Sequence, residues 1–307
     1  MNELQTERLL GENPNDIARA ATHLLDGALV AIPTETVYGL AARSDQEDAI
    51  RRVYDVKGRN PERALSVLVP NFDATATLWR TGPWIEAART LATHFWPGPL
   101  TIICPALDNV SPVLRGDSPN VGLRCPAHPV AQRILQEVNL PLVAPSANLS
   151  ESPSPTSAEA VAAQLDGKIS AIVEDDTTIG GLESTILSLE NERASLVRAG
   201  AISLVDINAV LDPTWQVPER HVHSPHSSRL VPTPASADVS IEIYAQGSWR
   251  TYEAASVDAL IQGLHAYLST LSDGERGGAA WRAGNALRND TRFAGICYLM
   301  DRYLRNR

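Results

Sequence analysis

The chain has 307 residues, of which 44% are hydrophobic and 20% are charged, and its formal net charge is −10. This length suits about two domains, and the ordinary composition excludes a wholly disordered or collagen-like chain. The acidic balance argues against a chain-wide electrostatic grip on nucleic acid or on an anionic membrane, but it does not exclude a local basic pocket. Of the 26 basic residues only two are lysine, Lys57 and Lys168.

Hydrophobic periodicity predicts alternating helices and strands over the first two thirds of the chain. Helices are expected from a cap at Asn13 or Asn15 to Gly27, and over Glu47–Val56, Trp84–Phe95, Pro129–Val138 and Ser157–Leu165. Strands are expected over Ala28–Ile32, Leu65–Val69, Leu100–Ile103, Val121–Arg124, Leu142–Ala144, Ile169–Val173, Thr185–Leu189 and Ser195–Val197. This alternation predicts an α/β domain built on a sheet.

The texture of the sequence changes after residue 211, and this change sets the predicted domain boundaries. Residues 212–237 are rich in proline, serine and histidine, so they are predicted to link a first domain, 1–211, to a small α/β domain, 238–307. In the second domain we expect strands at Val239–Ala245 and Thr251–Tyr252, and helices at Ser256–Leu271 and Phe293–Leu304. The linker histidines His221, His223 and His226 are more typical of a solvated segment than of a metal site.

The cysteines and the first residues favour a cytoplasmic protein. Cys104, Cys125 and Cys297 lie far apart without the spacing of metal ligands, so we expect reduced thiols rather than a disulfide framework or a zinc site. The segment MNELQTERLLGENPND is acidic and polar, unlike a secretory signal. Apolar runs such as Ala28–Pro33 fall far short of the roughly 20 residues that a membrane helix needs.

Polar segments follow several predicted strands, where open α/β sheets usually bind ligands. The chain contains no P-loop motif, no GxGxxG after a strand, no HExxH and no GxSxG. Lys57, Arg59 and Arg63 offer an ammonium and two guanidinium groups after a predicted helix, a combination that suits triphosphate oxygens. The alternative is a cationic helix end that complements the helix dipole.

Two further features remain open on the residues alone. Arg124 fits either an interior arginine paired with a carboxylate or a fork that binds a substrate carboxylate. The hydroxyl and amide groups of PSANLS and SPT fit turn and cap chemistry, or the orientation of a nucleotide or an amino acid.

Seven segments in chain order resemble one known family. They are IPTETVYGLA, YDVKGRNPE, FWPGPLT, VGLRCPAHPVA, APSANLSESPSPT, GLESTILSL and LVRAGAIS. Taken together they resemble the YrdC-type L-threonylcarbamoyladenylate synthases over residues 15–205 or so, and the length resembles that of the longer, two-domain members. The resemblance implies a twisted, open mixed sheet with a concave, positively charged cavity.

The resemblance also implies a reaction and its partners. L-threonine, bicarbonate and ATP would give L-threonylcarbamoyladenylate and pyrophosphate for the threonylcarbamoyladenosine modification of tRNA. Magnesium would arrive with ATP and be held by its phosphates, with no ligands from protein side chains. We expect hand-over to the tRNA threonylcarbamoyl transferase machinery, weak or no direct binding of tRNA, and no membrane partner.

The family's functional positions transfer residue by residue. The threonine site would comprise Thr36, Asn120, Arg124, Ala144 and Ser184. The ATP site would comprise Lys57, Arg59, Arg63, Ser146, Asn148, Ser154 and Arg198. Lys57 and Arg59 are the catalytic candidates, because two cations would stabilise the pyrophosphate leaving group.

The chain departs from the family pattern at three places. Leu68 stands where members often have histidine, and Glu151 replaces the usual glycine after SANxS. Ser224-Pro225-His226-Ser227 keeps only the start of the family's linker motif, without HYAP. Two other functions therefore stay open: an RNA-binding module, and a carbamoyl-adenylate-forming enzyme with a different acceptor.

Overall fold

The protein divides into two compact units, Met1–Pro218 and Glu219–Arg307. The computed structural model describes residues 5–175, 182–190 and 192–217 of the first unit, and three strands within residues 228–254 of the second. The division falls inside the predicted linker, and residues 212–217 are grouped with the first unit. Val217 is buried there, and its backbone N–H donates to Asn208 Oδ1 at 2.9 Å.

The first unit alternates strands and helices along the chain. Its strands are β1 (Glu7–Leu10), β2 (Val30–Ile32), β3 (Gly39–Arg43), β4 (Ser66–Leu68), β5 (Leu100–Pro105), β6 (Asn120–Arg124), β7 (Leu142–Val143), β8 (Ala171–Glu174), β9 (Thr185–Glu190) and β10 (Arg193–Arg198). Its α-helices are α1 (Pro14–Leu25), α2 (Glu47–Lys57), α3 (Ile85–Phe95), α4 (Pro112–Arg115), α5 (Pro129–Val138), α6 (Ala158–Leu165) and α7 (Leu204–Val210). Two short 3-10 helices are η1 (Asp73–Thr77) and η2 (Pro213–Trp215).

All ten strands of this unit form one open sheet in the order β1-β8-β2-β3-β7-β4-β6-β5-β9-β10. The pairs β1/β8, β2/β8, β4/β6 and β5/β9 are parallel. The pairs β2/β3, β3/β7, β4/β7, β5/β6 and β9/β10 are antiparallel. The expected mixed α/β sheet is therefore confirmed.

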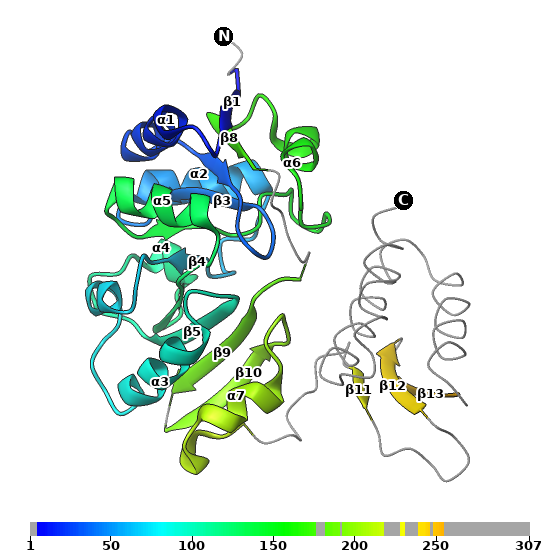
Figure 1. Ribbon diagram of the computed structural model, residues 1–307. Coiled ribbons are helices and arrows are strands. Elements are labelled where there is room, and N and C mark those ends of the chain that lie inside the picture. Colours follow the sequence, from blue (N-terminus) through cyan, green and yellow to red (C-terminus); the bar gives the residue numbers. More distant parts are fainter. Residues whose placement is uncertain are drawn as a thin grey trace. The chain divides into compact units, whose positions relative to one another are not determined.

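Helices cover the two faces of the sheet unequally. α1 and α5 pack on one face over the half that contains β1, β8 and β2, and α2 and α6 lie on the other side of these strands (Figure 1). The core beneath α2, α3, α4, α6 and α7 continues across β6, β5 and β9. On the α1/α5 side, no described helix continues over β5, β6 and β9.

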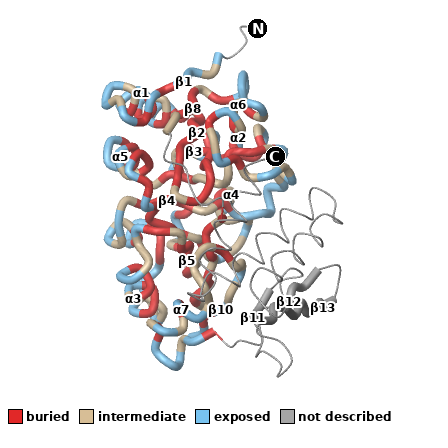
Figure 2. Tube along the Cα trace, turned by 45° about the vertical axis from the view of Figure 1, so that its right-hand side comes forward, coloured by how far each residue is buried: buried red, intermediate tan, exposed pale blue. Residues whose placement is uncertain are grey.

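The face of β5, β6 and β9 that no described helix covers carries polar side chains. Residues alternate between the two faces of a strand, so buried Val121 and Leu123 point to the core while Asn120 and Arg124 point away from it. Thr101 on β5 and Ser188 on β9 fall on the same outward face by the strand register. Figure 2 shows the buried trace concentrated in the strands, with exposed residues mostly on the outer turns of the helices.

Local capping chemistry sets the ends of several helices. The Asn13 side chain accepts from Asn15 N–H at the start of α1, and Ser157 Oγ accepts from Ala160 N–H at the start of α6. α5 begins with Pro129 after His128, whose ring nitrogen accepts from Val130 N–H. α2 ends at Gly58, which has φ +58°.

Among the strands and α-helices of the first unit, four were not anticipated from the sequence: β1, β3, α4 and α7. β3 contains Gly39-Leu40-Ala41-Ala42, which are buried on both faces and therefore show no alternation of apolar and polar residues. β1 buries only Leu9. α4 and α7 have four and seven residues, too short to show a helical period.

The second unit contains a three-stranded antiparallel sheet in the order β11-β12-β13. Its strands are β11 (Ser228–Leu230), β12 (Val239–Ala245) and β13 (Ser248–Ala254), so both expected strands are present. The helices expected at Ser256–Leu271 and Phe293–Leu304 lie outside the described residues. Among the residues that the structure describes, no helix is long and apolar enough to cross a membrane.

Leu123→Ala is expected to lower the free energy of unfolding by about 2–5 kcal/mol, because Leu123 is fully buried at the centre of β6. Chemical denaturation of the full chain measures this change. Val205→Ala, at a side chain that is 70% exposed on α7, should alter stability by no more than about 0.5 kcal/mol. Equal losses in the two variants would contradict the placement of the core.

Candidate functional site

Loops from distant parts of the chain meet in one site on the sheet. The end of β2 pairs with the start of β3 at Ile32 and Gly39, and Gly39 forms an isolated bridge with Ser146 after β7. Arg124, at the end of β6, and the starts of β5 and β9 lie at the opposite ends of the strands, because β7 pairs antiparallel with both β3 and β4. The two groups are joined by side chains: Thr36 of the loop 33–38 contacts Arg124, and Ser154 contacts Glu183.

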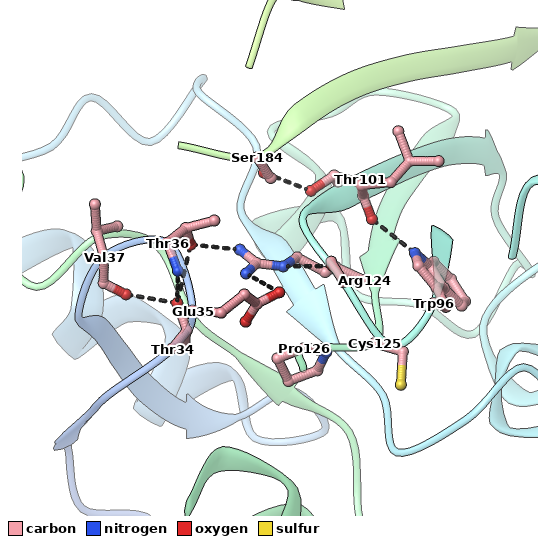
Figure 3. Close-up of polar contacts among 12 residues, drawn as sticks. Thr34, Glu35, Thr36, Val37, Trp96, Thr101, Arg124, Cys125, Pro126 and Ser184 are labelled. Atoms are coloured by element: carbon pink, nitrogen blue, oxygen red, sulfur yellow. Dashed lines mark hydrogen bonds and ion pairs between the residues drawn. The ribbon is translucent and has the colours of Figure 1, made fainter. Parts of the chain in front are cut away.

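Arg124 joins three of the converging segments. Its Nη1 donates to Thr36 Oγ1 at 2.9 Å, and its Nε donates to the Gly98 carbonyl at 3.2 Å. Its Nη2 lies 2.8 Å from Glu35 Oε1, with Arg124 8% and Glu35 21% exposed in their side chains. Figure 3 shows the guanidinium between Thr36 and Glu35. The structure thus realises the carboxylate-paired alternative for Arg124 while leaving its remaining N–H groups for a ligand.

The loop between β2 and β3 orders its hydroxyl groups in a chain. Thr34 Oγ1 donates to the Val37 carbonyl at 2.6 Å, so its lone pairs remain to accept a proton. Thr36 Oγ1, 2.9 Å from Thr34 Oγ1, is then the donor of that pair. Since Thr36 also accepts from Arg124, the hydrogen bonds run in one direction from the guanidinium to the backbone of Val37.

The Trp96-Pro97-Gly98 segment fixes the second partner of Arg124. The Trp96 ring stacks on Trp79 with centroids 6.2 Å apart, and its Nε1 donates to the Leu100 carbonyl at 2.7 Å. Gly98 N–H donates to the Cys125 carbonyl at 2.8 Å. The aromatic contact therefore holds the Gly98 carbonyl where Arg124 can reach it.

Lys57, at the end of α2, is buried and bound to the loop after β7. Its Nζ donates to the Ser146 carbonyl at 2.5 Å, to the Asn148 carbonyl at 2.6 Å and to Asn148 Oδ1 at 3.3 Å. These contacts use all three ammonium protons. Burial, followed by repulsion from Arg59, lowers the pKa of Lys57 to about 8.

Arg59 and Arg63 follow Lys57 on the same turn. Arg59 Nε donates to the Arg63 carbonyl at 3.2 Å and its Nη2 donates to the Ala64 carbonyl at 2.9 Å. Burial, with repulsion from Arg63, lowers the pKa of Arg59 from its ordinary value. Arg63 is exposed. The three cations thus form a positive patch beside the loop 146–148.

Arg198, at the end of β10, binds the segment before β9. Its Nη2 donates to the Ser184 carbonyl at 2.8 Å and to Ser184 Oγ at 3.0 Å, and its Nη1 pairs with Glu183. Ser154 Oγ donates to the other oxygen of Glu183 at 2.8 Å. Burial lowers the pKa of Arg198, and Glu183 opposes that shift. Ser184 Oγ lies 2.8 Å from Thr101 Oγ1.

The structure brings together most of the positions expected for the site. Thr36 contacts Arg124, Ser184 contacts Thr101, and Ala144 N–H donates to the Ser66 carbonyl at 3.0 Å. Lys57, Ser146 and Asn148 form the buried contacts around the Lys57 ammonium described above. Ser154 and Arg198 meet at Glu183.

Asn120 is the exception among the expected threonine-site residues. It is the first residue of β6 and Arg124 is the last, so their Cα atoms lie about 13 Å apart along the strand. The Asn120 side chain donates to Glu190 Oε2 at 2.8 Å, at the far end of β9. The structure therefore separates Asn120 from Arg124.

Leu68 occupies a hydrophobic environment. It is 2% exposed and belongs to the core cluster that contains the buried residues of α1 and α5. The side chain is accommodated by apolar packing at this position of β4.

Sequence reasoning did not single out several residues that complete the site. Glu35 pairs with Arg124, Glu183 pairs with Arg198, and Thr34 and Thr101 extend the hydroxyl contacts. Glu35 and Glu183 stand inside PTETVYG and GLESTILSL, next to expected residues, and this adjacency was the available signal. Among the described residues, no group of three or more His, Cys, Asp or Glu could hold a metal ion.

The fold and these side chains define an α/β protein whose candidate site contains four buried or half-buried cations, Lys57, Arg59, Arg124 and Arg198. The family model Sua5/YciO/YrdC, described as telomere recombination, matches residues 22–200. The chain therefore belongs to the Sua5/YciO/YrdC family.

Two curated relatives and one solved structure place the chain more closely. It is 44% identical over 205 residues to the threonylcarbamoyl-AMP synthase of Bacillus subtilis, covering 66% of this chain and 59% of the relative. It is 40% identical over 192 residues to that of Pyrococcus abyssi, covering 62% and 56%. The crystal structure of P. abyssi Sua5 complexed with L-threonine matches with a TM-score of 0.65 at 36% identity, covering 69% of this chain and 62% of that one. The chain thus matches less than two thirds of the length of these proteins.

Gly200→Ala is expected to disturb the contacts of Ser184. A Cβ at Gly200 would lie 2.3 Å from Thr185 N and 2.4 Å from the carbonyl carbon of Ser184, which are backbone atoms that cannot rotate away. We expect a loss of about 1–3 kcal/mol in the free energy of unfolding, measured by urea denaturation. Gly122→Ala is the matched control, because the atoms nearest to its Cβ belong to side chains, Ile103 Cγ1 at 3.2 Å and Thr101 Cγ2 at 3.3 Å. A Gly200 variant as stable as the control would contradict the close approach.

Proposed function

We propose that the protein is an L-threonylcarbamoyladenylate synthase. It would form L-threonylcarbamoyl-AMP and pyrophosphate from L-threonine, bicarbonate and ATP. The observation that carries the proposal is the grouping of Lys57, Arg59, Arg124 and Arg198 in one site on a sheet of this family. The names of the B. subtilis and P. abyssi relatives support the same activity.

The Arg124 group is the proposed amino-acid site. An arginine fork binds a carboxylate through two parallel hydrogen bonds, and Arg124 is held from two sides by Thr36 and Gly98. Thr36 and Ser184 would supply hydroxyl groups beside the ligand, and Ala144 would border it. The solved complex of P. abyssi Sua5 with L-threonine supports this choice of ligand.

Lys57, Arg59, Arg63 and Arg198 are the proposed ATP side, together with Ser146, Asn148 and Ser154. Arg59 and Arg198 would neutralise phosphate oxygens. Lys57 would donate to a phosphate oxygen only after giving up one of its hydrogen bonds to the loop 146–148. This donor set suits phosphates, so we propose that the phosphates bring Mg²⁺, which would add charge neutralisation for the leaving pyrophosphate.

The chemistry needs no protein nucleophile. The threonine amine attacks the carbon of CO₂ derived from bicarbonate and loses a proton, which gives a carbamate. A carbamate oxygen then attacks the α-phosphorus of ATP, and the bond to the bridging oxygen breaks to release pyrophosphate. The residues of the proposed amino-acid and ATP sites would therefore act by positioning the substrates and stabilising charge.

We further propose a cytoplasmic location and a diffusible product that passes to the tRNA threonylcarbamoyl transferase machinery. Cys104 and Cys125 are buried free thiols, which suits a reducing compartment. The net charge of −10 suits a protein that does not itself hold tRNA strongly.

Pyrophosphate release from ATP should require both L-threonine and bicarbonate. Arg59→Ala should lower the rate by roughly 10²- to 10³-fold, because one charge-stabilising group is lost. Arg51→Ala is the matched control. Arg51 is exposed on α2, the helix that ends just before Arg59, and it pairs only with Glu47 among the described residues.

Three outcomes would redirect the proposal. Full activity of Arg59→Ala would overturn the assignment of the site. Release of pyrophosphate that ignores L-threonine would favour an enzyme with a different acceptor. Salt-dependent binding of plain RNA without ATP turnover would favour an RNA-binding module.

The affinity for ATP should fall as the pH rises above about 8, because Lys57 loses its charge there. The lowered pKa of Lys57 makes its contribution to the free energy of unfolding increase between about pH 8 and its ordinary value of 10.5, so unfolding does not explain such a loss. Calorimetric titration with ATP across this range measures the effect. Lys57→Arg should flatten the profile, Lys168→Ala should keep it, and an unchanged affinity in the unaltered protein would contradict the prediction.

A further inference from the structure

Glu35, beside Arg124 in the candidate site, is a carboxylate with unused hydrogen-bonding capacity. Neither of its buried oxygens makes a hydrogen bond to a described residue, although Oε1 lies 2.8 Å from Arg124 Nη2. Nη2 likewise makes no hydrogen bond there, so the pair is close in distance but not aligned. Carboxylates that are kept from water normally accept several hydrogen bonds.

The surroundings of Glu35 leave Arg124 as its only close positive charge among the described residues. Its other titratable neighbours are Cys125 and His128. Burial lowers the pKa of His128, which favours the neutral ring, and Asp175 lies 3.9 Å from its Nε2. A cation bound beside Glu35 would therefore find a carboxylate there, with Arg124 as the single balancing charge in the described part of the chain, whereas the side that contains Lys57 and Arg59 is rich in fixed positive charge.

We propose that Glu35 binds the α-ammonium group of the amino-acid substrate while Arg124 binds its α-carboxylate. This inference rests on the proposed function and assigns the part of the substrate that the cations cannot bind. A zwitterion presents opposite charges on neighbouring atoms, and the adjacent Glu35 and Arg124 present the complementary pair. Two cations at this place would repel the ammonium group.

The same contact selects the atom that reacts. The ammonium group must lose its proton before the nitrogen can attack carbon, and a carboxylate beside it accepts hydrogen bonds from that nitrogen and fixes its direction. Thr36, one residue further along, is held by Arg124 and by Thr34, so the loop that carries Glu35 is already ordered.

The test compares two ligands in the full chain: L-threonine, and the analogue in which a hydroxyl group replaces the α-amine, (2S,3R)-2,3-dihydroxybutanoate. Calorimetric binding to the unaltered protein should favour L-threonine by about 10- to 100-fold, as expected for a hydrogen bond to a charged group. Glu35→Gln should weaken L-threonine by a similar factor and leave the analogue nearly unchanged. Glu47→Gln, which alters an exposed carboxylate that pairs with Arg51 outside the site, is the matched control and should keep the preference.

Each contrary outcome has a separate meaning. Equal binding of both ligands by the unaltered protein would overturn the role of Glu35 without any variant. Equal weakening of both ligands in Glu35→Gln would show that Glu35 only positions Arg124, and would also overturn it. Absence of L-threonine binding to the unaltered protein would instead overturn the proposed function, and this inference with it.

Discussion

The placement of Arg124 is the constraint on which the rest of the site depends. Its guanidinium group contacts the loop after β2 and the turn before β5. The backbone of Arg124 pairs with the end of β4. These segments lie far apart in the sequence and have no other shared polar partner of this kind among the described residues. Removing a buried charge of this kind, or one of its partners, is costly because the remaining groups cannot regain their contacts with water.

Two arginine–glutamate pairs determine how charge is distributed in the candidate site. Arg124 with Glu35 is a largely buried pair, and Arg198 with Glu183 is a partly exposed one. In an acidic chain these pairs confine the positive charge to one place, where Lys57 and Arg59 add to it. The two halves of the site differ in their excess charge. The Lys57 half is positive, and the Arg124 half is balanced by Glu35, which matches a polyanion on one side and a zwitterion on the other.

Much of the fold followed from the sequence because the helices carry strong local signals. α5 runs over Pro129–Val138 as predicted, since it combines a first-turn proline with a clear helical period. β3 was not predicted because burial on both faces removes the alternation that marks a strand. Burial of this kind is a tertiary property and leaves no local pattern.

The site was predictable in its residues but less so in its contacts. Family motifs selected Lys57, Arg59, Arg124 and Arg198, but they did not indicate that Lys57 donates all its protons to the loop 146–148. They also grouped Asn120 with Arg124, although the two residues stand at opposite ends of β6. The roles of Glu35 and Glu183 required the pairing of distant segments, which only the folded structure reveals.

The stacked indoles of Trp79 and Trp96 give the molecule an intrinsic optical probe. Trp96 lies two residues before the carbonyl that receives Arg124, and its ring nitrogen is tied to Leu100 at the start of the neighbouring strand. Any movement of Arg124 toward a ligand would be transmitted through Gly98 to this ring pair. Binding of a ligand at the proposed amino-acid site should therefore change the tryptophan fluorescence, without a label and without turnover.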